Sequence, residues 1–290
     1  MNYLDIFVEK KKGLYKQVNL PAYGSQDVGI TPGGVMDQFS FDCGNAVLGN
    51  PDNSPALEII LPPVLLVREN IYFAMTGAPF VSPQMVINSS RTTVQHGTVY
   101  FAPAGAELVF GTRKSGLRSY LCYRRANRDT LDTALVERSL GNFEAINRWV
   151  DSEGYMRVIE GPEYKYLASP EDFFTTEWSV SLYTNEIGMR LESKKKLEVK
   201  ADNIISEAVT TGTIQATPGE LIILLKHRPT IGGYPRVFSV INADVDLLSQ
   251  YMPQQVLRFK KVTIKEAWRI ARQKRKEILS LKKVFRMYDS

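Results

Sequence analysis

The pattern of the chain is set by the stretch Leu221-Ile222-Ile223-Leu224-Leu225, which is followed by the turn residues Gly232-Gly233-Tyr234-Pro235 and by a second apolar run from Pro235 to Ile241. Short runs of Val, Ile, Leu, Tyr and Phe that are cut by Gly, Pro and Asn are typical of β-strands joined by turns. Nine further runs have this character: Tyr3 to Val8, Leu57 to Leu61, Pro63 to Val67, Ile71 to Thr76, Glu107 to Phe110, Ser119 to Tyr123, Tyr155 to Ile159, Ser179 to Tyr183 and Met189 to Leu191. Their short, fairly regular spacing favours β-barrels or sandwiches over a parallel sheet with crossover helices, so we predict a mainly β fold with a few helices.

Two short helices are predicted between the strands. Asp37 suits the N-cap of a helix, and Gly49 can adopt the left-handed conformation that ends it. A second helix is predicted from Asp244 to Met252, where Pro253 closes it.

A third, longer helix is predicted at the end of the sequence. Thr263 and Glu266 have the spacing of a capping box. Apolar residues then recur at helical intervals: Ile264, Ala267 or Trp268, Ala271, Ile278, Leu281 and Phe285. We expect this stripe to dock on the body of the protein or on a partner, with Lys and Arg mainly on the solvated side.

The basic charge of the chain belongs to that terminal segment. Residues 260–286 contain eleven Lys or Arg and two Glu, a net charge of +9, whereas the whole chain carries +5 and the remainder therefore −4. A nucleic-acid-binding domain is expected to interleave its charges with stacking aromatic residues, so the pI of about 9.0 does not indicate a nucleic-acid partner. A membrane surface is disfavoured as well, because Ala267 and Ala271 leave the stripe without a bulky apolar face.

Length and cysteine usage favour a cytoplasmic protein. At 290 residues and 44% hydrophobic, the chain can bury a sizeable core without a disulfide or a metal. Cys43 and Cys122 lie far apart with no neighbouring Cys or paired His, so their spacing indicates neither a zinc site nor a disulfide framework. The first twelve residues lack the order of a secretory signal, and no uncharged apolar run is long enough to span a membrane.

One polar, charged stretch divides the β pattern. It runs from Arg124 to Gly154 and is poor in β-branched residues. We therefore predict a first β lobe over residues 1–123, a connecting segment over 124–154, a second β lobe over 155–262 and a basic helix over 263–290.

Several sequence blocks carry a resemblance to a known family. In the second half they are Gly188-Met189-Arg190-Leu191-Glu192, Thr213-Ile214-Gln215-Ala216-Thr217-Pro218-Gly219, Thr230 with Gly232-Gly233-Tyr234-Pro235, and Val240-Ile241-Asn242-Ala243-Asp244. In the first half they are Gly34-Val35-Met36-Asp37, Leu48-Gly49-Asn50, Ala56-Leu57-Glu58 and Thr76-Gly77-Ala78. In this order they resemble the C-type component of bacterial 5-oxoprolinase, also called KipA-like or allophanate hydrolase subunit 2 type, and one half of the carboxyltransferase part of urea amidolyase.

The resemblance implies a fold, a partner and a chemistry. The fold is a pair of linked cyclophilin-like β-barrel lobes, here with an added C-terminal helix. The partner is a B-subunit or KipI-like protein, and a homo-oligomer is also possible. The activity is ATP-dependent opening of a small cyclic amide, or carboxyl transfer from biotin to a ureido compound. ATP or biotin would enter through the complex, since no Walker-A motif is present.

The candidate substrate-binding residues follow from the same blocks: Gln215, Arg228, Thr230, Gly232, Gly233 and Tyr234. Glycines let backbone N–H groups approach a ligand closely, and Gln and Thr side chains suit a neutral amide. We expect these residues, with Arg190, to line one concave surface. The alternative is that Gly-Gly-Tyr-Pro is only a tight turn.

The candidate catalytic residues are Asp37, Glu58, Arg190 and His227, and no metal ligands are predicted. Asp37 is equally well explained as a helix N-cap. His96, the other histidine, is interpreted as a loop residue.

The chain departs from the family where chemistry is expected. Gln26-Asp27-Val28-Gly29 either matches the family's "Q-D-x-G-R" motif followed by a deletion or falls beyond it, and neither alignment supplies the arginine. His227-Arg228-Pro229-Thr230 replaces "D-R-Q-T", and Arg124-Arg125-Ala126-Asn127 stands where a glycine-rich run is expected. An alternative function therefore stays open: a non-catalytic KipA-like protein that binds and regulates a KipI-like partner.

Overall fold

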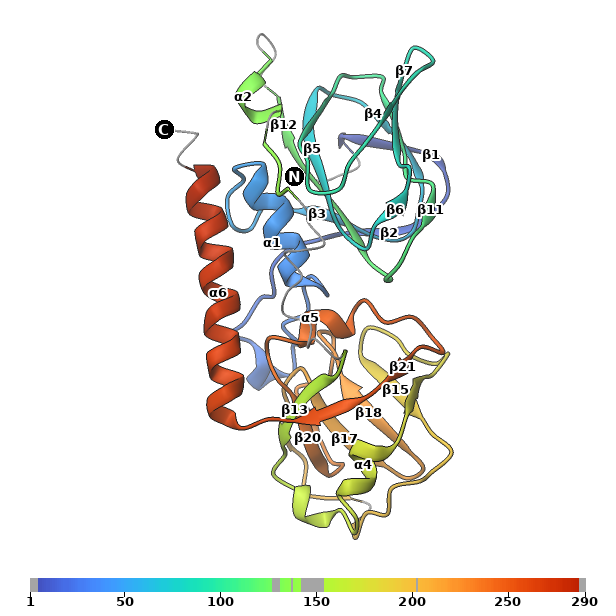
Figure 1. Cartoon of the computed structure of the whole chain (residues 1–290), viewed down its shortest axis with the longest axis vertical. Helices are drawn as coiled ribbons and strands as arrows, with labels where there is room; N and C mark the ends of the chain where they lie inside the picture. The colour runs from blue at the N-terminus through green and yellow to red at the C-terminus, as the bar shows by residue number, and fades with distance from the viewer. Residues whose placement is uncertain (1–4, 127–130, 137, 142–153, 202, 287–290) are drawn as a thin grey trace. The chain divides into compact units, whose positions relative to one another are not determined.

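The computed structural model describes residues 5–126, 131–136, 138–141, 154–201 and 203–286. The chain divides into two compact units. Unit 1 comprises residues 1–20, 37–146 and 276–290, and unit 2 comprises residues 21–36 and 147–275. Each unit is built mainly of β-strands (Figure 1), so the predicted fold class, with two β-barrel lobes and a C-terminal helix, is confirmed.

Unit 1 contains two five-stranded sheets and a short ribbon. One sheet has the order β1 (Phe7–Lys11), β4 (Val64–Val67), β10 (Glu107–Val109), β7 (Gln84–Ile87) and β8 (Ser90–Thr93). The other has the order β2 (Leu14–Val18), β3 (Ala56–Leu61), β12 (Ser119–Arg125), β5 (Ile71–Gly77) and β9 (Tyr100–Ala102). The ribbon pairs β6 (Phe80–Val81) with β11 (Thr112–Arg113). All seven residues of β5 are buried, as the continuous apolar run of a central strand requires.

Helix α1 (Gln38–Val47) packs against β5 and β12 of unit 1. Its predicted N-cap is confirmed, because the Asp37 side chain accepts the backbone N–H of Ser40 at 3.0 Å. Gly49 has φ +66°, the left-handed conformation expected at the end of the helix. Helix α2 (Thr133–Val136) lies in the segment predicted to connect the lobes, of which residues 127–130, 137 and 142–153 fall outside the described part of the chain.

Unit 2 is built round one eight-stranded sheet. Its order is β21 (Val256–Leu257), β14 (Trp178–Val180), β15 (Gly188–Glu192), β18 (Glu220–Leu224), β17 (Thr213–Thr217), β20 (Arg236–Val240), β13 (Met156–Glu160) and β22 (Phe259–Lys261). The two outermost strands, β21 and β22, are separated in the chain only by Arg258. The sheet therefore curls until its edges nearly meet, as in a barrel.

Smaller elements complete unit 2: η2 (Gln26–Val28), η3 (Tyr164–Tyr166), α4 (Glu171–Thr175), the strand pair β16 (Glu207–Ala208) and β19 (Ile231–Gly232), and α5 (Val245–Leu248). Phe173 of α4 stacks on Phe238 and Phe259 in the core. Met36 belongs to the same core although it precedes unit 1's helix in the chain. The helix predicted from Asp244 to Met252 is only the single turn α5, since residues 249 and 250 form a turn and residues 251 and 252 have no regular structure.

Helix α6 (Ile264–Arg286) is the predicted terminal helix. The backbone N–H of Glu266 donates to the Thr263 hydroxyl at 3.2 Å, which is half of the predicted capping box. The predicted docking is confirmed for residues 264–275, because Ile270 is buried with Ile241, Ala243 and Val262 of unit 2. Among the described helices, none is long and apolar enough to cross a membrane.

The predicted apolar stripe of α6 is correct only in part. Phe285 is buried as expected, but Ile264 and Trp268 are each 63% exposed. The buried positions instead include Ile270 and Lys274, four residues apart on one side of the helix. Lys274 escaped the prediction because a buried lysine leaves no trace in an apolar pattern.

Candidate functional site

The structure distributes the candidate residues over both units. Asp37 and Glu58 belong to unit 1, and the other eight belong to unit 2. Their geometry is therefore described separately for each unit.

In unit 1, Asp37 and Glu58 are joined through the phenol of Tyr120. The Tyr120 hydroxyl donates to Glu58 Oε2 at 2.8 Å and accepts the backbone N–H of Asp37 at 2.8 Å. The Asp37 carboxylate also accepts the Ser40 hydroxyl at 2.7 Å, and Glu58 Oε1 lies 3.3 Å from Arg118 Nε. Burial, together with the charges of Glu58 and Asp37, raises the pKa of Tyr120 well above its ordinary value. Both carboxylates thus hold the fold of unit 1 together, and a catalytic role for either stays a prediction.

In unit 2, four side chains form a row across neighbouring strands. Ile222 is the register partner of both Arg190 and Gln215, and Gln215 is in turn the partner of Arg236. Directly paired residues of an antiparallel sheet point to the same face, and this face is opposite to the one that carries Met189, Ile214 and Ile223 into the core. Two strand spacings separate Arg190 from Gln215, about 10 Å between Cα atoms. Arg190 is salt-bridged to Glu220 on this face.

Gln215, Gly232 and Tyr234 are brought together at this row. The Gln215 side chain is 5% exposed, and its Nε2 donates to the Tyr234 carbonyl oxygen at 3.4 Å. A Cβ on Gly232 would lie 2.5 Å from Gln215 Nε2, and one on Gly233 would lie 3.1 Å from Ser206 Oγ. The glycines therefore allow close packing of the Gln215 amide beneath β19, and their φ values are not left-handed. Tyr234 is 38% exposed beside them.

Arg236, the last residue of the row, has its donors satisfied by protein atoms. Its Nε and Nη2 donate to the two carboxylate oxygens of Glu163, each at 2.8 Å. Nη2 also reaches Glu207 Oε2 at 2.6 Å, and Nη1 reaches the Ala208 carbonyl at 3.2 Å. This bidentate arrangement raises the pKa of Arg236 and lowers that of Glu163, mainly through the hydrogen bonds between the two side chains. Arg236 is thus a structural arginine, and sequence analysis did not single it out.

Arg228 is buried in the opposite situation. It is 7% exposed, and its Nε and Nη1 have no hydrogen-bond partner among the described residues. Burial lowers the pKa of its guanidinium. A buried guanidinium without acceptors costs several kcal/mol, roughly, unless a ligand supplies them.

His227 precedes Arg228 on the same loop. Its Nε2 is buried without a hydrogen bond among the described residues and lies 3.7 Å from Glu186 Oε2. The segment 21–36 lies against this loop: the Thr31 hydroxyl donates to the Lys226 carbonyl at 3.3 Å, and a Cβ on Gly33 would lie 3.4 Å from His227 Cε1. This neighbourhood was not predicted, because nothing in the sequence pairs residues 195 positions apart.

The candidate site of unit 2 thus has two parts. One is the Gln215 row with Gly232, Gly233 and Tyr234, and the other is the loop with His227 and Arg228. Thr230 lies on the chain between them, and its carbonyl accepts the Val209 N–H at 3.1 Å. Within the described part of the chain, no group of three or more His, Cys, Asp or Glu side chains could hold a metal ion.

The family is identified by a sequence model of the "Carboxyltransferase domain, subdomain A and B", which matches residues 28–128 and 125–261. The chain belongs to this family, and the resemblance inferred from its sequence blocks is confirmed. Helix α6 lies beyond the matched residues.

Individual relatives agree with this assignment. The C-type component of the 5-oxoprolinase of Haemophilus influenzae is 26% identical over 303 residues, covering 93% of this chain and 94% of that protein. The urea amidolyase of Lachancea kluyveri is 24% identical over 85% of this chain but only 16% of its own length. The crystal structure of the K. lactis urea amidolyase superposes with a TM-score of 0.79 at 21% identity, covering 95% of this chain and 20% of that one. The chain thus spans about a fifth of the urea amidolyase chain.

Proposed function

We propose that the chain is a subunit of an enzyme complex that acts on a small cyclic amide or ureido compound, either as in a 5-oxoprolinase or by carboxyl transfer as in urea amidolyase. The observation that supports this most directly is the buried guanidinium of Arg228, whose Nε and Nη1 lack acceptors among the described residues. A carboxyl group, or an oxygen on which negative charge develops, would supply those acceptors in a site of low dielectric.

The amide part of the substrate is assigned to the Gln215 row. A side-chain amide offers a donor and an acceptor, which match the acceptor and donor of an amide or ureido group. Tyr234 beside it adds a half-exposed phenol and a flat face. Gly232 and Gly233 keep this part of the surface free of Cβ atoms.

His227 is the proposed proton acceptor. A proton has to leave the substrate nitrogen when that nitrogen takes up a carboxyl group, and imidazole accepts protons near neutral pH. The proximity of Glu186 Oε2, at 3.7 Å from Nε2, favours the protonated imidazole that results.

The cofactors are assigned to the complex. Carboxylated biotin, when bound, supplies a carboxyl group as an anion, and Arg228 is the residue with free donors that fits such a group. The chain has no Walker-A motif, so we assign ATP to another subunit. The proposed partner is a B-subunit or KipI-like protein in the cytoplasm.

The test is a comparison of Arg228→Gln with Arg258→Gln in the copurified native complex. Arg258 is an exposed arginine of unit 2 that pairs with Glu177. We expect Arg228→Gln to lower 5-oxoproline-dependent ATP hydrolysis, or urea carboxylation, by about a hundredfold, as loss of a charge-stabilising donor does. Equal activity of the two variants would contradict the proposed role of Arg228.

A second candidate function is the non-catalytic KipA-like regulator. It is favoured by Asp37 and Glu58, since both carboxylates are occupied in the buried network around Tyr120. In that case the copurified complex forms without turnover of either substrate, and adding this chain changes the activity of its KipI-like partner in the same way for wild type and Arg228→Gln.

A further inference from the structure

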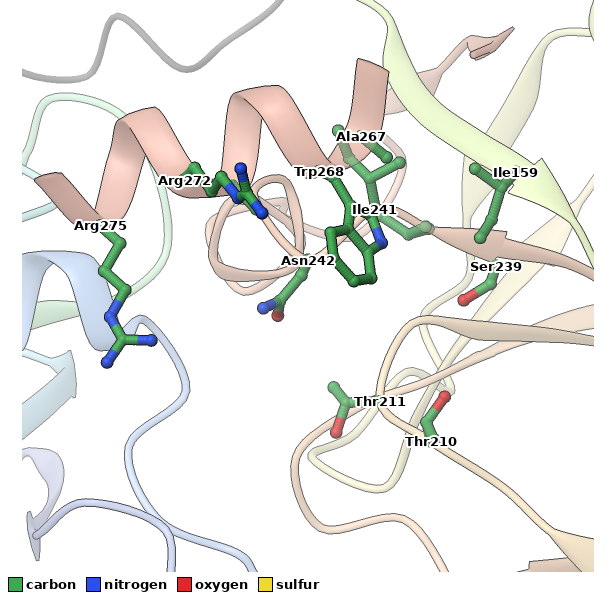
Figure 2. Close-up of a pocket in the computed structure, with 12 residues that line it drawn as sticks. Ile159, Thr210, Thr211, Ser239, Ile241, Asn242, Ala267, Trp268, Arg272 and Arg275 are labelled. Atoms are coloured by element: carbon green, nitrogen blue, oxygen red, sulfur yellow. The ribbon is translucent and has the colours of Figure 1, made fainter. Parts of the chain in front are cut away.

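A pocket lies between the first turns of α6 and the outer side of unit 2's sheet (Figure 2). Its volume is about 620 Å³, within the range of roughly 300 to 1,000 Å³ that small-molecule sites occupy. One wall is α6, whose residues lie beyond the matched family ranges. We call this space the α6 pocket, and it is separate from the residues assigned to the amide and anion sites above.

The apolar part of the α6 pocket is made by an exposed aromatic ring and small side chains. Ala267 and Ala271 leave room between the helix and the strand residues Ile159 and Ile241. Trp268 is 63% exposed, so this large ring is not used to fill the core. Figure 2 shows the Trp268 ring directed into the space below α6.

The polar part faces the ring and has hydroxyl and amide groups. Thr210 and Thr211 come from the loop before β17, Ser239 from β20, and Asn242 from the turn after it. Figure 2 shows Thr210 and Thr211 across the space from Trp268. Such groups fix the orientation of a polar ligand through hydrogen bonds.

The charged part is two arginines of α6. Arg272 and Arg275 line the pocket, and its lining contains no Asp or Glu. Among the residues that the structure describes, neither guanidinium has an ion pair, whereas Lys274 and Lys282 of the same helix are paired with Asp246 and Asp42. Arg272 lies 5.9 Å from the centre of the Trp268 ring, which places its charge beside the aromatic face.

We propose that the α6 pocket binds a small aromatic anion, with the ring packed on Trp268 and a carboxylate or phosphate held by Arg272 and Arg275. A ring and an anion are needed together because the pocket offers one aromatic surface and two unpaired cations. An aliphatic cation finds no carboxylate there, and a purely apolar ligand would leave both guanidinium groups without a partner.

The experiment is isothermal titration calorimetry of the full chain with matched probes. AMP is compared with inorganic phosphate and adenosine, and indole-3-acetate is compared with acetate and indole. We expect at least one of the two ring-bearing anions to bind about tenfold more tightly than either of its parts, and the better one identifies phosphate or carboxylate as the preferred anion. If neither ring-bearing anion exceeds its parts, the proposal is wrong.

Variants connect the binding to the pocket. Arg272→Gln with Arg275→Gln, and separately Trp268→Leu, are expected to weaken binding about tenfold, and all three side chains are exposed enough for the helix to remain folded. The matched control is Arg269→Gln, an exposed arginine of α6 that does not line the pocket. Equal weakening by Arg269→Gln would assign the effect to the general charge of the helix and overturn the site.

Discussion

At the scale of single residues, Arg228 and Arg236 show how two buried arginines of one unit differ in availability. They are 7% and 9% exposed. Arg236 has carboxylate or carbonyl acceptors at each of its three nitrogens, whereas Nε and Nη1 of Arg228 have none among the described residues. The same residue type therefore serves stability at one position and is free for a ligand at the other.

The Glu163–Arg236 pair predicts a defined pH dependence. The pKa of Glu163 is lowered in the folded chain, so its stabilisation is complete above the ordinary carboxyl value of 4.5 and is lost as the pH falls through the lowered value. We expect Glu163→Gln to reduce the free energy of unfolding at pH 7 by about 1 to 3 kcal/mol. The difference from wild type should shrink below pH 4.5, as measured by urea denaturation at several pH values.

The matched control is Glu160→Gln, because Glu160 forms an exposed pair with Lys261. Exposed pairs contribute roughly 0 to 1 kcal/mol. If Glu163→Gln loses no more stability than Glu160→Gln at pH 7, the buried pair does not have the assigned role.

Gly232 gives a prediction that separates binding from stability. The Cβ of Gly232→Ala would meet Gln215 Nε2 at 2.5 Å, and the end of that side chain can move aside at little cost. We expect a change in unfolding free energy within about 1 kcal/mol. The displaced amide should raise KM for the amide or ureido substrate about tenfold, an effect that uniform binding groups have.

Gly233→Ala is the control for this prediction, since its Cβ would lie 3.1 Å from a serine hydroxyl that can rotate. A KM raised equally by both substitutions would show that the Gln215 amide is not the group being disturbed.

What the sequence could predict at this scale was the type of residue and its block. Gln215, Gly232 and Tyr234 were predicted to share a surface, and the amide, the glycine and the Tyr234 backbone do lie in contact. The partners could not be predicted, because Arg236 and Glu163 are 73 positions apart and no local pattern joins them. The lack of acceptors at Arg228 is likewise a property of the folded neighbourhood.

At the scale of elements, the strands were predictable and the phase of α6 was not. The predicted run Ile71 to Thr76 is β5, and Leu57 to Leu61 is β3, because apolar runs mark buried strands. Strand β8, by contrast, consists of four exposed residues, Ser90–Thr93, and carries no apolar signal. In α6 the side facing unit 2 includes a charged residue, Lys274, so an apolar stripe predicted the wrong side for Ile264 and Trp268.

Lys274 is expected to be the strongest single contribution of α6 to stability. Its Nζ donates to the Ala243 carbonyl at 2.7 Å and to Asp246 Oδ2 at 2.9 Å, and the residue is 8% exposed. Lys274→Met would leave both acceptors buried without this donor, at a cost of about 3 kcal/mol in unfolding free energy. Urea denaturation of Lys274→Met beside Lys276→Met, an exposed neighbour on the helix, measures the difference. A Lys274→Met curve that overlays that of Lys276→Met would refute this assignment.

At the scale of the whole molecule, each unit is assembled from separated pieces of chain. The predicted first lobe over residues 1–123 includes residues 21–36, and these belong to unit 2, where Met36 is 1% exposed in the core. We expect the isolated segment 155–262 to give a poorly dispersed NMR spectrum. Residues 21–36, joined through a flexible linker to residues 147–275, should restore dispersion because they return Met36 and the Thr31 contact. A well-dispersed spectrum of 155–262 alone would contradict this requirement.

This connectivity has a consequence for synthesis of the protein on the ribosome. Residues 21–36 emerge early, but the strands that enclose Met36 are translated only after residue 147. At about 5 to 20 residues per second, the interval before residue 275 emerges is on the order of 10 to 50 seconds. Unit 1 has to wait still longer, since it takes up residues 276–290. The nascent chain therefore carries both cores unfinished while nearly all of these residues are being made, and its protection from aggregation during that time has to come from chaperones.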